Sequence, residues 1–161
     1  MLGADTGQIA ELGTAAESVG EHPVVRAHLT YGWQQLMLGD GDGHVVVAGD
    51  INVAATDRDV FHPDAFVDAT HVTAPEREAL ARLLAAGLVD VDVARWGPRA
   101  RRLTWWNHGI GYSRNLGMRI DLIASDHALA ARLDTTWIDH VGRSQQRPSD
   151  HAALIADFHH P

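Results

Sequence analysis

The chain has 161 residues, of which 45% are hydrophobic, and it contains no cysteine. This length suits one domain with a buried core, and the lack of cysteine excludes a disulfide framework, a thiolate metal site and a cysteine nucleophile. No apolar run reaches the roughly 18 residues of a membrane-spanning helix, and the first twenty residues lack the features of a secretory signal, so we expect a cytoplasmic protein with no membrane partner.

The formal net charge of −8 is distributed unevenly along the chain. Residues 1–94 carry four Arg against fifteen Asp and Glu, a balance of −11, whereas residues 95–151 carry nine Arg against five Asp, a balance of +4. A basic segment of this kind suits phosphate backbones, and it equally suits a solvated arginine face that has no partner. Charge alone leaves both interpretations open.

The first predicted element is a helix over residues 24–38, which ends before Gly39. Its apolar side chains recur at the three- and four-residue spacing of one helical face: Val25, Leu29, Trp33, Leu36 and Met37. The continuous run Val45–Ala48 then predicts a strand that is buried on both faces. Asp50 and Asn52 follow this strand, and their spacing of two residues directs both side chains to the same side.

A second helix is predicted to begin after Thr73, because Glu76 three residues later completes a capping box. Gly87 supplies its stop. The remaining apolar segments predict strands over residues 88–93, 102–106, 118–125, 135–139 and 151–158, a short helix over 128–133 and a glycine-rich loop over 107–117. Strands that alternate with single helices indicate a layered α/β or α+β architecture.

Three short acidic motifs lie beside predicted strands: Gly49-Asp50-Ile51-Asn52, Arg119-Ile120-Asp121 and Ser149-Asp150-His151. A carboxylate can orient or deprotonate an attacking water, and a neutral amide can bind the water or a phosphate without adding negative charge. An imidazole beside a carboxylate can hold a positive charge near a phosphate oxygen. Each motif alone also has a structural explanation, such as an Asx turn at a strand end, but the three together favour phosphoryl chemistry.

The motifs, with the segment between them, resemble the exonuclease III family of DNA-repair nucleases, or AP endonucleases, within the endonuclease/exonuclease/phosphatase superfamily. The paired Trp105-Trp106 and the stretch from Asn115 to Asp121 carry the resemblance, because Ser-Asp-His also ends other branches of the superfamily. It implies an α+β fold that is part of a four-layer, DNase I-like sandwich whose N-terminal half is absent. Residues 22–161 would be the C-terminal part of that domain, and residues 1–21 a divergent N-terminal segment.

The resemblance also implies an activity: a divalent-metal-dependent DNA phosphodiesterase with 3′-5′ exonuclease and abasic-site endonuclease action in DNA repair. DNA is then the expected partner and Mg²⁺ or Mn²⁺ the expected cofactor. The implied catalytic residues are Asp50, Asn52, Asp121 and His151, with Asp50 activating the water and Asp121 orienting His151. The implied metal ligands are Asp50, Asn52, Asp150 and His151, and the implied substrate contacts are Trp105, Asn115 and Met118.

The chain departs from the family pattern in its first part, where the metal-binding Glu and an Asn near the phosphate have no counterpart. A sheet face containing Val46, Ile123 and Leu154 would then lack its covering sheet, and we expect it to form an exposed apolar patch prone to association. Alternatives therefore stay open: a non-catalytic half-domain that forms a homodimer, pairs with the missing half or binds DNA, and a phosphodiesterase that acts on another phosphate ester.

Overall fold

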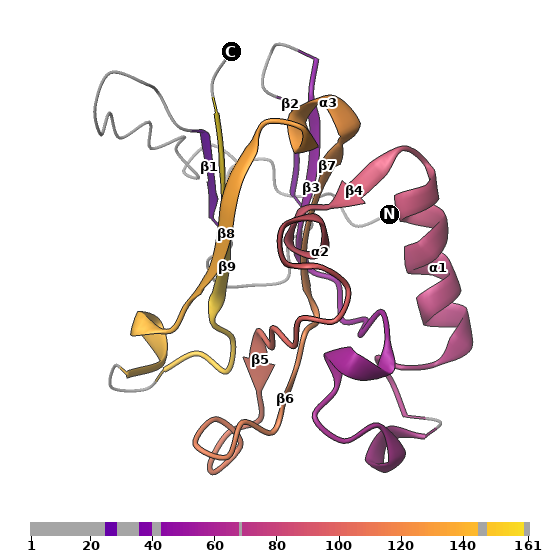
Figure 1. Ribbon diagram of the computed structural model, residues 1–161. Helices are drawn as coiled ribbons and strands as arrows, with labels where there is room; N and C mark the ends of the chain where they lie inside the picture. Colours follow the sequence, from indigo (N-terminus) through magenta and orange to yellow (C-terminus); the bar gives the residue numbers. More distant parts are fainter. Residues whose placement is uncertain (1–24, 29–35, 40–42, 68, 145–147, 160–161) are drawn as a thin grey trace, which may run out of the picture.

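Two antiparallel sheets pack face to face in the computed structural model (Figure 1). The structure describes residues 25–28, 36–39, 43–67, 69–144 and 148–159. Three strands form the first sheet, in the order β1 (Val25–His28), β9 (Ala153–Phe158) and β8 (Leu133–Asp139). The second sheet has the order β2 (Leu36–Gly39), β3 (Val45–Asp50), β7 (Asp121–Asp126) and β4 (Leu88–Asp90). A short pair, β5 (Trp105–Trp106) and β6 (Gly117–Met118), extends from one end of the sheets.

Three α-helices complete the layers within the described part of the chain. The longest, α1 (Ala74–Ala85), lies along the outer face of the second sheet, where Leu80 packs with Leu122 and Ala124 of β7 (Figure 1). The others are α2 (Val91–Trp96) and α3 (His127–Ala130), and 3₁₀ turns span Asp57–Asp59, Pro63–Phe66 and Val141–Ser144. None of the described helices has the length and apolar character needed to cross a membrane.

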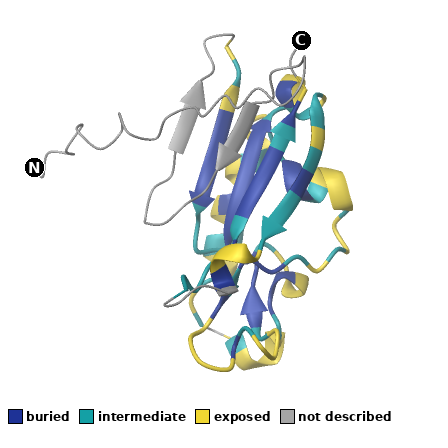
Figure 2. Ribbon diagram, turned by 90° about the vertical axis from the view of Figure 1, so that its left-hand side faces the viewer, coloured by how far each residue is buried: buried dark blue, intermediate teal, exposed yellow. Residues whose placement is uncertain are grey.

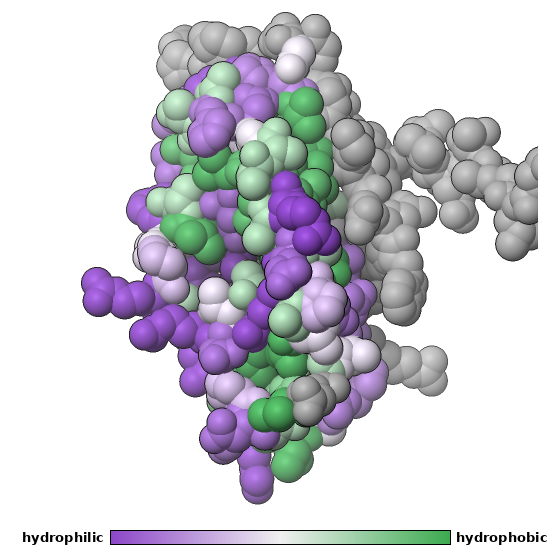
Figure 3. All heavy atoms as spheres, turned by 90° about the vertical axis from the view of Figure 1, so that its right-hand side faces the viewer, coloured by the Kyte–Doolittle hydropathy of each residue, from purple (hydrophilic) through white to green (hydrophobic). Residues whose placement is uncertain are grey.

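The main core lies between the two sheets. Val46 of β3, Ile123 of β7 and Leu154 of β9 belong to one hydrophobic cluster and are 8%, 0% and 1% exposed. Buried residues follow the middle strands, whereas exposed ones gather in loops and on helices (Figure 2). On the face that shows the right-hand side of Figure 1, hydrophilic and hydrophobic residues are intermixed (Figure 3). The expected exposed patch around Val46, Ile123 and Leu154 is therefore wrong, because each sheet covers the inner face of the other.

Several elements agree with the sequence patterns. β3 contains the run predicted to be a buried strand, and α1 begins after Thr73, where Glu76 Oε2 accepts hydrogen bonds from Thr73 N (2.9 Å) and Thr73 Oγ1 (2.7 Å). β8 contains the strand predicted over 135–139. The strand predicted over 118–125 is divided between β6 and β7, and the one over 102–106 is reduced to β5.

Two predicted elements are wrong. Residues 24–38 do not form one helix, because β1 and β2 occupy both ends of this segment; residues 29–35 lie outside the described ones. Pairing of β1 with β9 and of β2 with β3 satisfies backbone groups that the edges of those strands would otherwise leave free, and this outweighs the local helical periodicity. The strand predicted over 88–93 ends at Asp90, whose carboxylate accepts from the amides of Asp92 and Val93 and so begins α2.

Candidate active site

Strand pairing brings the three acidic motifs to one end of the sheets, from which β5 and β6 extend (Figure 1). Asp50 is the last residue of β3 and lies opposite Asp121, the first residue of β7. His151 forms an isolated β-bridge with Trp105 of β5, which places the third motif beside the other two. Residues that are 71 and 30 positions apart in the sequence thus meet through backbone pairing rather than through side-chain contacts alone.

His151 lies between the two carboxylates. Its Nδ1 is 3.0 Å from Asp121 Oδ2 and 3.2 Å from Asp121 Oδ1, so Nδ1–H donates to this carboxylate. Its Nε2 is 3.7 Å from Asp50 Oδ2. Asp121 is buried, whereas His151 and Asp50 are partly exposed. A buried carboxylate that holds one ring nitrogen fixes the imidazole orientation and leaves Nε2 directed toward the accessible side of the site.

The electrostatics of the site favour a protonated His151 beside a carboxylate that can accept a proton. Burial by itself lowers the pKa of His151, but the hydrogen bond and charge of Asp121, followed by the charges of Asp50 and Asp150, raise it above the ordinary value. The pKa of Asp50 is raised, chiefly by burial and further by the charge of Asp121, although its hydrogen bond from Asn52 opposes the change. A carboxylate with a raised pKa is a better general base near neutral pH.

A tight turn carries Asn52. Its amide N–H donates to Asp50 Oδ1 (2.9 Å), and its backbone adopts φ +54°, in the left-handed region that Asn tolerates better than most residues. The carbonyl oxygen of Asn52 accepts a hydrogen bond from His71 Nδ1 (2.7 Å), and His71 itself has φ +77°. The sequence patterns did not point to His71, because the two segments are separated by nineteen positions and only the tertiary fold joins them.

The third motif is tied to the aromatic pair. Trp105 Nε1 donates to Asp150 Oδ2 (3.0 Å), and the amide of Trp106 donates to the carbonyl of Asp150 (2.9 Å). His108 Nε2 lies 4.0 Å from the same Asp150 Oδ2. Trp105 is partly exposed, so its indole edge faces the carboxylate while part of the ring stays accessible.

The other predicted substrate contacts differ in exposure. Asn115 is exposed at φ +54°, and its Oδ1 accepts from Trp106 Nε1 (3.0 Å), so its side-chain NH₂ is the group that could donate to a substrate. Met118 pairs with Trp105 across β5 and β6 but is only 1% exposed, within a cluster that includes Val60 and Ile120. Direct contact of Met118 with a substrate therefore remains a prediction that requires local rearrangement.

The described residues do not by themselves fit a divalent cation. No group of three or more His, Asp or Glu side chains within them could hold a metal ion. Of the four predicted ligands, Asp50 and Asp150 each already accept an N–H through one carboxylate oxygen. Mg²⁺ prefers six oxygen ligands in octahedral geometry, so a cation here needs further ligands from solvent, substrate or other residues.

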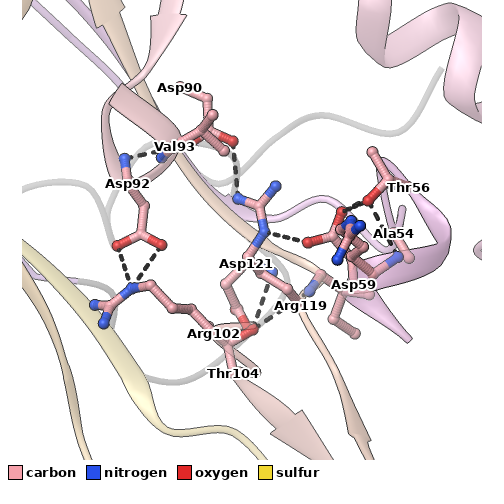
Figure 4. A network of polar contacts seen from close by, with 12 residues as sticks. Ala54, Thr56, Asp59, Asp90, Asp92, Val93, Arg102, Thr104, Arg119 and Asp121 are labelled. Atoms are coloured by element: carbon pink, nitrogen blue, oxygen red, sulfur yellow. Dashed lines mark hydrogen bonds and ion pairs between the residues drawn. The ribbon is translucent and has the colours of Figure 1, made fainter. Parts of the chain in front are cut away.

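A buried polar network lies next to the site and reaches the backbone of Asp121 (Figure 4). Arg119 is 7% exposed, and its Nε and Nη1 each lie 2.8 Å from a carboxylate oxygen, of Asp59 and Asp90 respectively. Thr104 Oγ1 accepts from the amides of Ile120 and Asp121 at 3.3 Å. The network fixes the 3₁₀ turn Asp57–Asp59, the start of α2 and the start of β7 relative to one another. Arg119 stands in the second acidic motif, and its motif position is the one signal in the sequence that could have suggested this role.

Comparisons with known proteins agree with the architecture. The sequence model of the Endonuclease/Exonuclease/phosphatase family matches residues 21–151. An exodeoxyribonuclease of Bacillus subtilis is 30% identical over 112 residues, which cover 66% of this chain and 44% of the relative. The 3′ phosphatase NExo from Neisseria, solved with a product DNA hairpin, is 35% identical with a TM-score of 0.69 and coverage of 72% and 45%. An AP endonuclease from Archaeoglobus fulgidus is 33% identical with a TM-score of 0.66 and coverage of 74% and 47%.

The matched segments are similar in extent. The chain spans less than half the length of each of these relatives, and its sheets and helices follow the DNase I-like fold of the solved ones over that part. The family match covers well over half of the chain, including all three acidic motifs. The chain therefore belongs to the endonuclease/exonuclease/phosphatase family.

Proposed function

We propose that residues 22–161 form the C-terminal part of a DNA phosphodiesterase domain that acts as a 3′-5′ exonuclease and at abasic sites. The observation that carries the proposal is the Asp121–His151–Asp50 arrangement, in which one imidazole lies 3.0 Å from a buried carboxylate and 3.7 Å from an accessible one. The names of the matched relatives, an exodeoxyribonuclease and an AP endonuclease, support DNA as the substrate.

In the proposed reaction, Asp50 accepts a proton from a water molecule as the water oxygen forms a bond to phosphorus. The bond from phosphorus to the departing sugar oxygen breaks on the opposite side, and that oxygen takes up a proton from solvent. The raised pKa of Asp50 suits it to this role. The side-chain amide of Asn52 helps to position the water or the phosphate without adding negative charge.

His151 stabilises the charge that develops on a non-bridging phosphate oxygen. Its raised pKa increases the protonated fraction near neutral pH, so that Nε2–H can donate to the phosphate while Nδ1–H donates to Asp121. Asp121 is thus a positioning residue that acts through the imidazole. On the substrate side, the accessible part of Trp105 offers a stacking surface for a sugar or base, and the side-chain amide of the exposed Asn115 offers a donor to a phosphate.

The experiment is a cleavage assay with a duplex that contains one abasic site and a labelled 3′ end, in buffers with Mg²⁺ or Mn²⁺. Parent protein, His151→Gln and the matched surface variant Arg82→Gln are compared. We expect cleavage by the parent and by Arg82→Gln, and a loss of about 10²-fold or more in His151→Gln, as is typical for loss of a charge-stabilising donor. Equal cleavage by the parent and His151→Gln would refute the assigned site.

One observation favours a second candidate, a DNA-binding module without catalysis. The described residues contain no complete metal-ligand group, and such a group is what the resemblance implies for hydrolysis. Under this alternative the parent binds the abasic duplex with a salt-dependent affinity but leaves it intact with either metal ion. Cleavage by the parent that is lost in His151→Gln would exclude the alternative.

A further inference from the structure

Exposed arginines lie outside the candidate active site, on α2 (labelled in Figure 1) and on the segment that follows it. The eight residues from Arg95 to Arg102 contain four of the thirteen arginines and no acidic residue, in a chain with net charge −8. Arg95, Arg99 and Arg101 are exposed, and together with Trp96 they form what we call the arginine–tryptophan surface.

The fold neutralises little of this charge. Arg102, at the end of the segment, is paired with the buried Asp92, whose carboxylate oxygens both lie 2.9 Å from Arg102 Nε. The ion pairs within the described part of the chain include none of Arg95, Arg99 or Arg101. A local excess of positive charge can attract a polyanion even when the protein as a whole is acidic.

Trp96 organises the arginines beside it. Its indole is 44% exposed, and Nε1 donates to the side-chain oxygen (2.8 Å) and carbonyl oxygen (3.1 Å) of Thr136, so the ring is held in place. The guanidinium carbons of Arg95 and Arg102 lie 4.6 and 4.8 Å from the ring centroid. A guanidinium stacked on a ring keeps its N–H donors at its edges, where they can bind a phosphate as a planar fork.

Buried contacts link the arginine–tryptophan surface to the candidate site. Arg101 Nη2 donates to the carbonyl of Val60 (3.3 Å), Val60 forms a β-bridge with Met118, and Met118 pairs with Trp105 of the site. Val60 and Met118 are buried, so these contacts fix the position of Arg101 relative to Trp105, which follows it by four residues in the chain.

We propose that the arginine–tryptophan surface binds the phosphate backbone of the nucleic acid that occupies the candidate site, several nucleotides away from the reacting phosphate. The inference rests on the proposed function for the identity of the partner. A phosphate backbone is favoured over an acidic protein because the exposed guanidiniums are arrayed beside a candidate phosphodiester site, where the same backbone continues. Such contacts hold the substrate without reading its sequence.

The test is a binding titration without divalent metal, in which fluorescence anisotropy follows a labelled duplex of about 20 base pairs with a central abasic site, at about 50 to 200 mM salt. The variant Arg95→Gln/Arg99→Gln is compared with the parent and with Arg82→Gln, an arginine on α1 that is 71% exposed and has a single partner, Glu78, at 3.9 Å. Two lost phosphate contacts should reduce the magnitude of the slope of log K against log salt by roughly 1.8 and weaken binding about tenfold or more, whereas Arg82→Gln should match the parent.

The outcomes separate this inference from the proposed function. If the parent cleaves the abasic duplex and the double variant binds with the parental affinity and slope, the binding role of the arginine–tryptophan surface is refuted while the proposed function stands. If the parent binds the duplex but never cleaves it, and the double variant shows a smaller slope of log K against log salt, the binding role of the surface is supported while the hydrolytic function is refuted. If the parent does not bind the duplex at all, the proposed binding role of the surface is overturned. Equal displacement of the duplex by polyglutamate at the same charge concentration would overturn nucleic acid as the partner in favour of an acidic protein.

Discussion

Replacement of Arg119 by Met should destabilise the fold substantially, because it leaves two buried carboxylates without their shared cation. Both Asp59 and Asp90 lie 2.8 Å from the guanidinium, and each is at most 10% exposed. Burial by itself lowers the pKa of Arg119, but the charges of Asp90 and Asp59 outweigh it and raise the pKa, so the arginine is held as a cation. Removal of one partner from a buried ion pair typically costs about 3–5 kcal/mol.

The structure places the expected loss at the lower end of that range. Asp59 Oδ2 keeps its hydrogen bonds from the amide and hydroxyl of Thr56, and Asp90 Oδ1 keeps those from the start of α2. Neither carboxylate therefore becomes wholly unsatisfied. We expect a loss of about 3 kcal/mol in the free energy of unfolding, which for a chain of this size lowers Tm by about 6–12 °C.

Urea denaturation followed by far-ultraviolet circular dichroism measures this loss. Arg82→Met is the matched control, since Arg82 is 71% exposed, and its effect should stay within about 0.5 kcal/mol. The triple variant Arg119→Met/Asp59→Asn/Asp90→Asn removes the stranded charges and should be more stable than Arg119→Met alone. A loss below about 1 kcal/mol in Arg119→Met would refute the argument that the buried network carries this energy.

Three further changes test local parts of the structure. Because the pKa of His151 is raised in the folded state, its charge stabilises the fold below the unfolded pKa of about 6.5, and this contribution is lost as pH rises through the folded pKa. Between about pH 6 and pH 8, the free energy of unfolding measured in urea should therefore fall more in the parent than in His151→Gln. Thr73→Ala removes the capping partner of Glu76 and should cost about 1 kcal/mol near neutral pH by the same assay; since the pKa of Glu76 is lowered, chiefly by its hydrogen bond from Thr73, the difference from the parent should shrink as pH falls below about 4.5. His71→Gly relieves the φ of +77° but removes the bond to the Asn52 carbonyl, each worth about 1 kcal/mol, so Tm should change by only a few degrees while the amide resonance of Asn52 shifts in a ¹⁵N-correlated spectrum; an unchanged resonance would contradict the link.

Local sequence patterns were sufficient where a single signal dominates. Residues 46–48 of β3 are buried, whereas Val45 at the start of the predicted run is 37% exposed. This run has no competing helical pattern, and the Thr73–Glu76 pair marks the start of α1. The segment after β4 was less clear, because Val91, Val93 and their neighbours alternate as in a strand. An Asp at position 90 that could cap a helix was the available signal for α2, and tertiary contact of Asp92 with Arg102 adds support that no local pattern contains.

The site shows the same division between local and long-range information. The acidic motifs named the side chains that the structure brings together at Asp50, Asp121 and His151. The partners that orient them are distant in sequence: His71 holds the carbonyl of Asn52, and Trp105 holds Asp150. Hydrogen bonds of this kind depend on where two loops meet, which neither periodicity nor spacing encodes.

The geometry of the site depends on the register between β3 and β7, which is also held at the opposite end of this strand pair. A slip of one residue would turn Asp50 and Asp121 toward opposite faces of the sheet and separate the carboxylates that flank His151. At the far end, Asp126 accepts hydrogen bonds from the amide of Val45 (2.8 Å) and from His44 Nδ1 (3.2 Å). Burial alone would raise the pKa of Asp126, but the amides of Leu129 and Val45 and the side chain of His44 lower it to about 2. Because this carboxylate stays ionised well into the acid range, it can hold the register under conditions in which the charges of the site itself have changed.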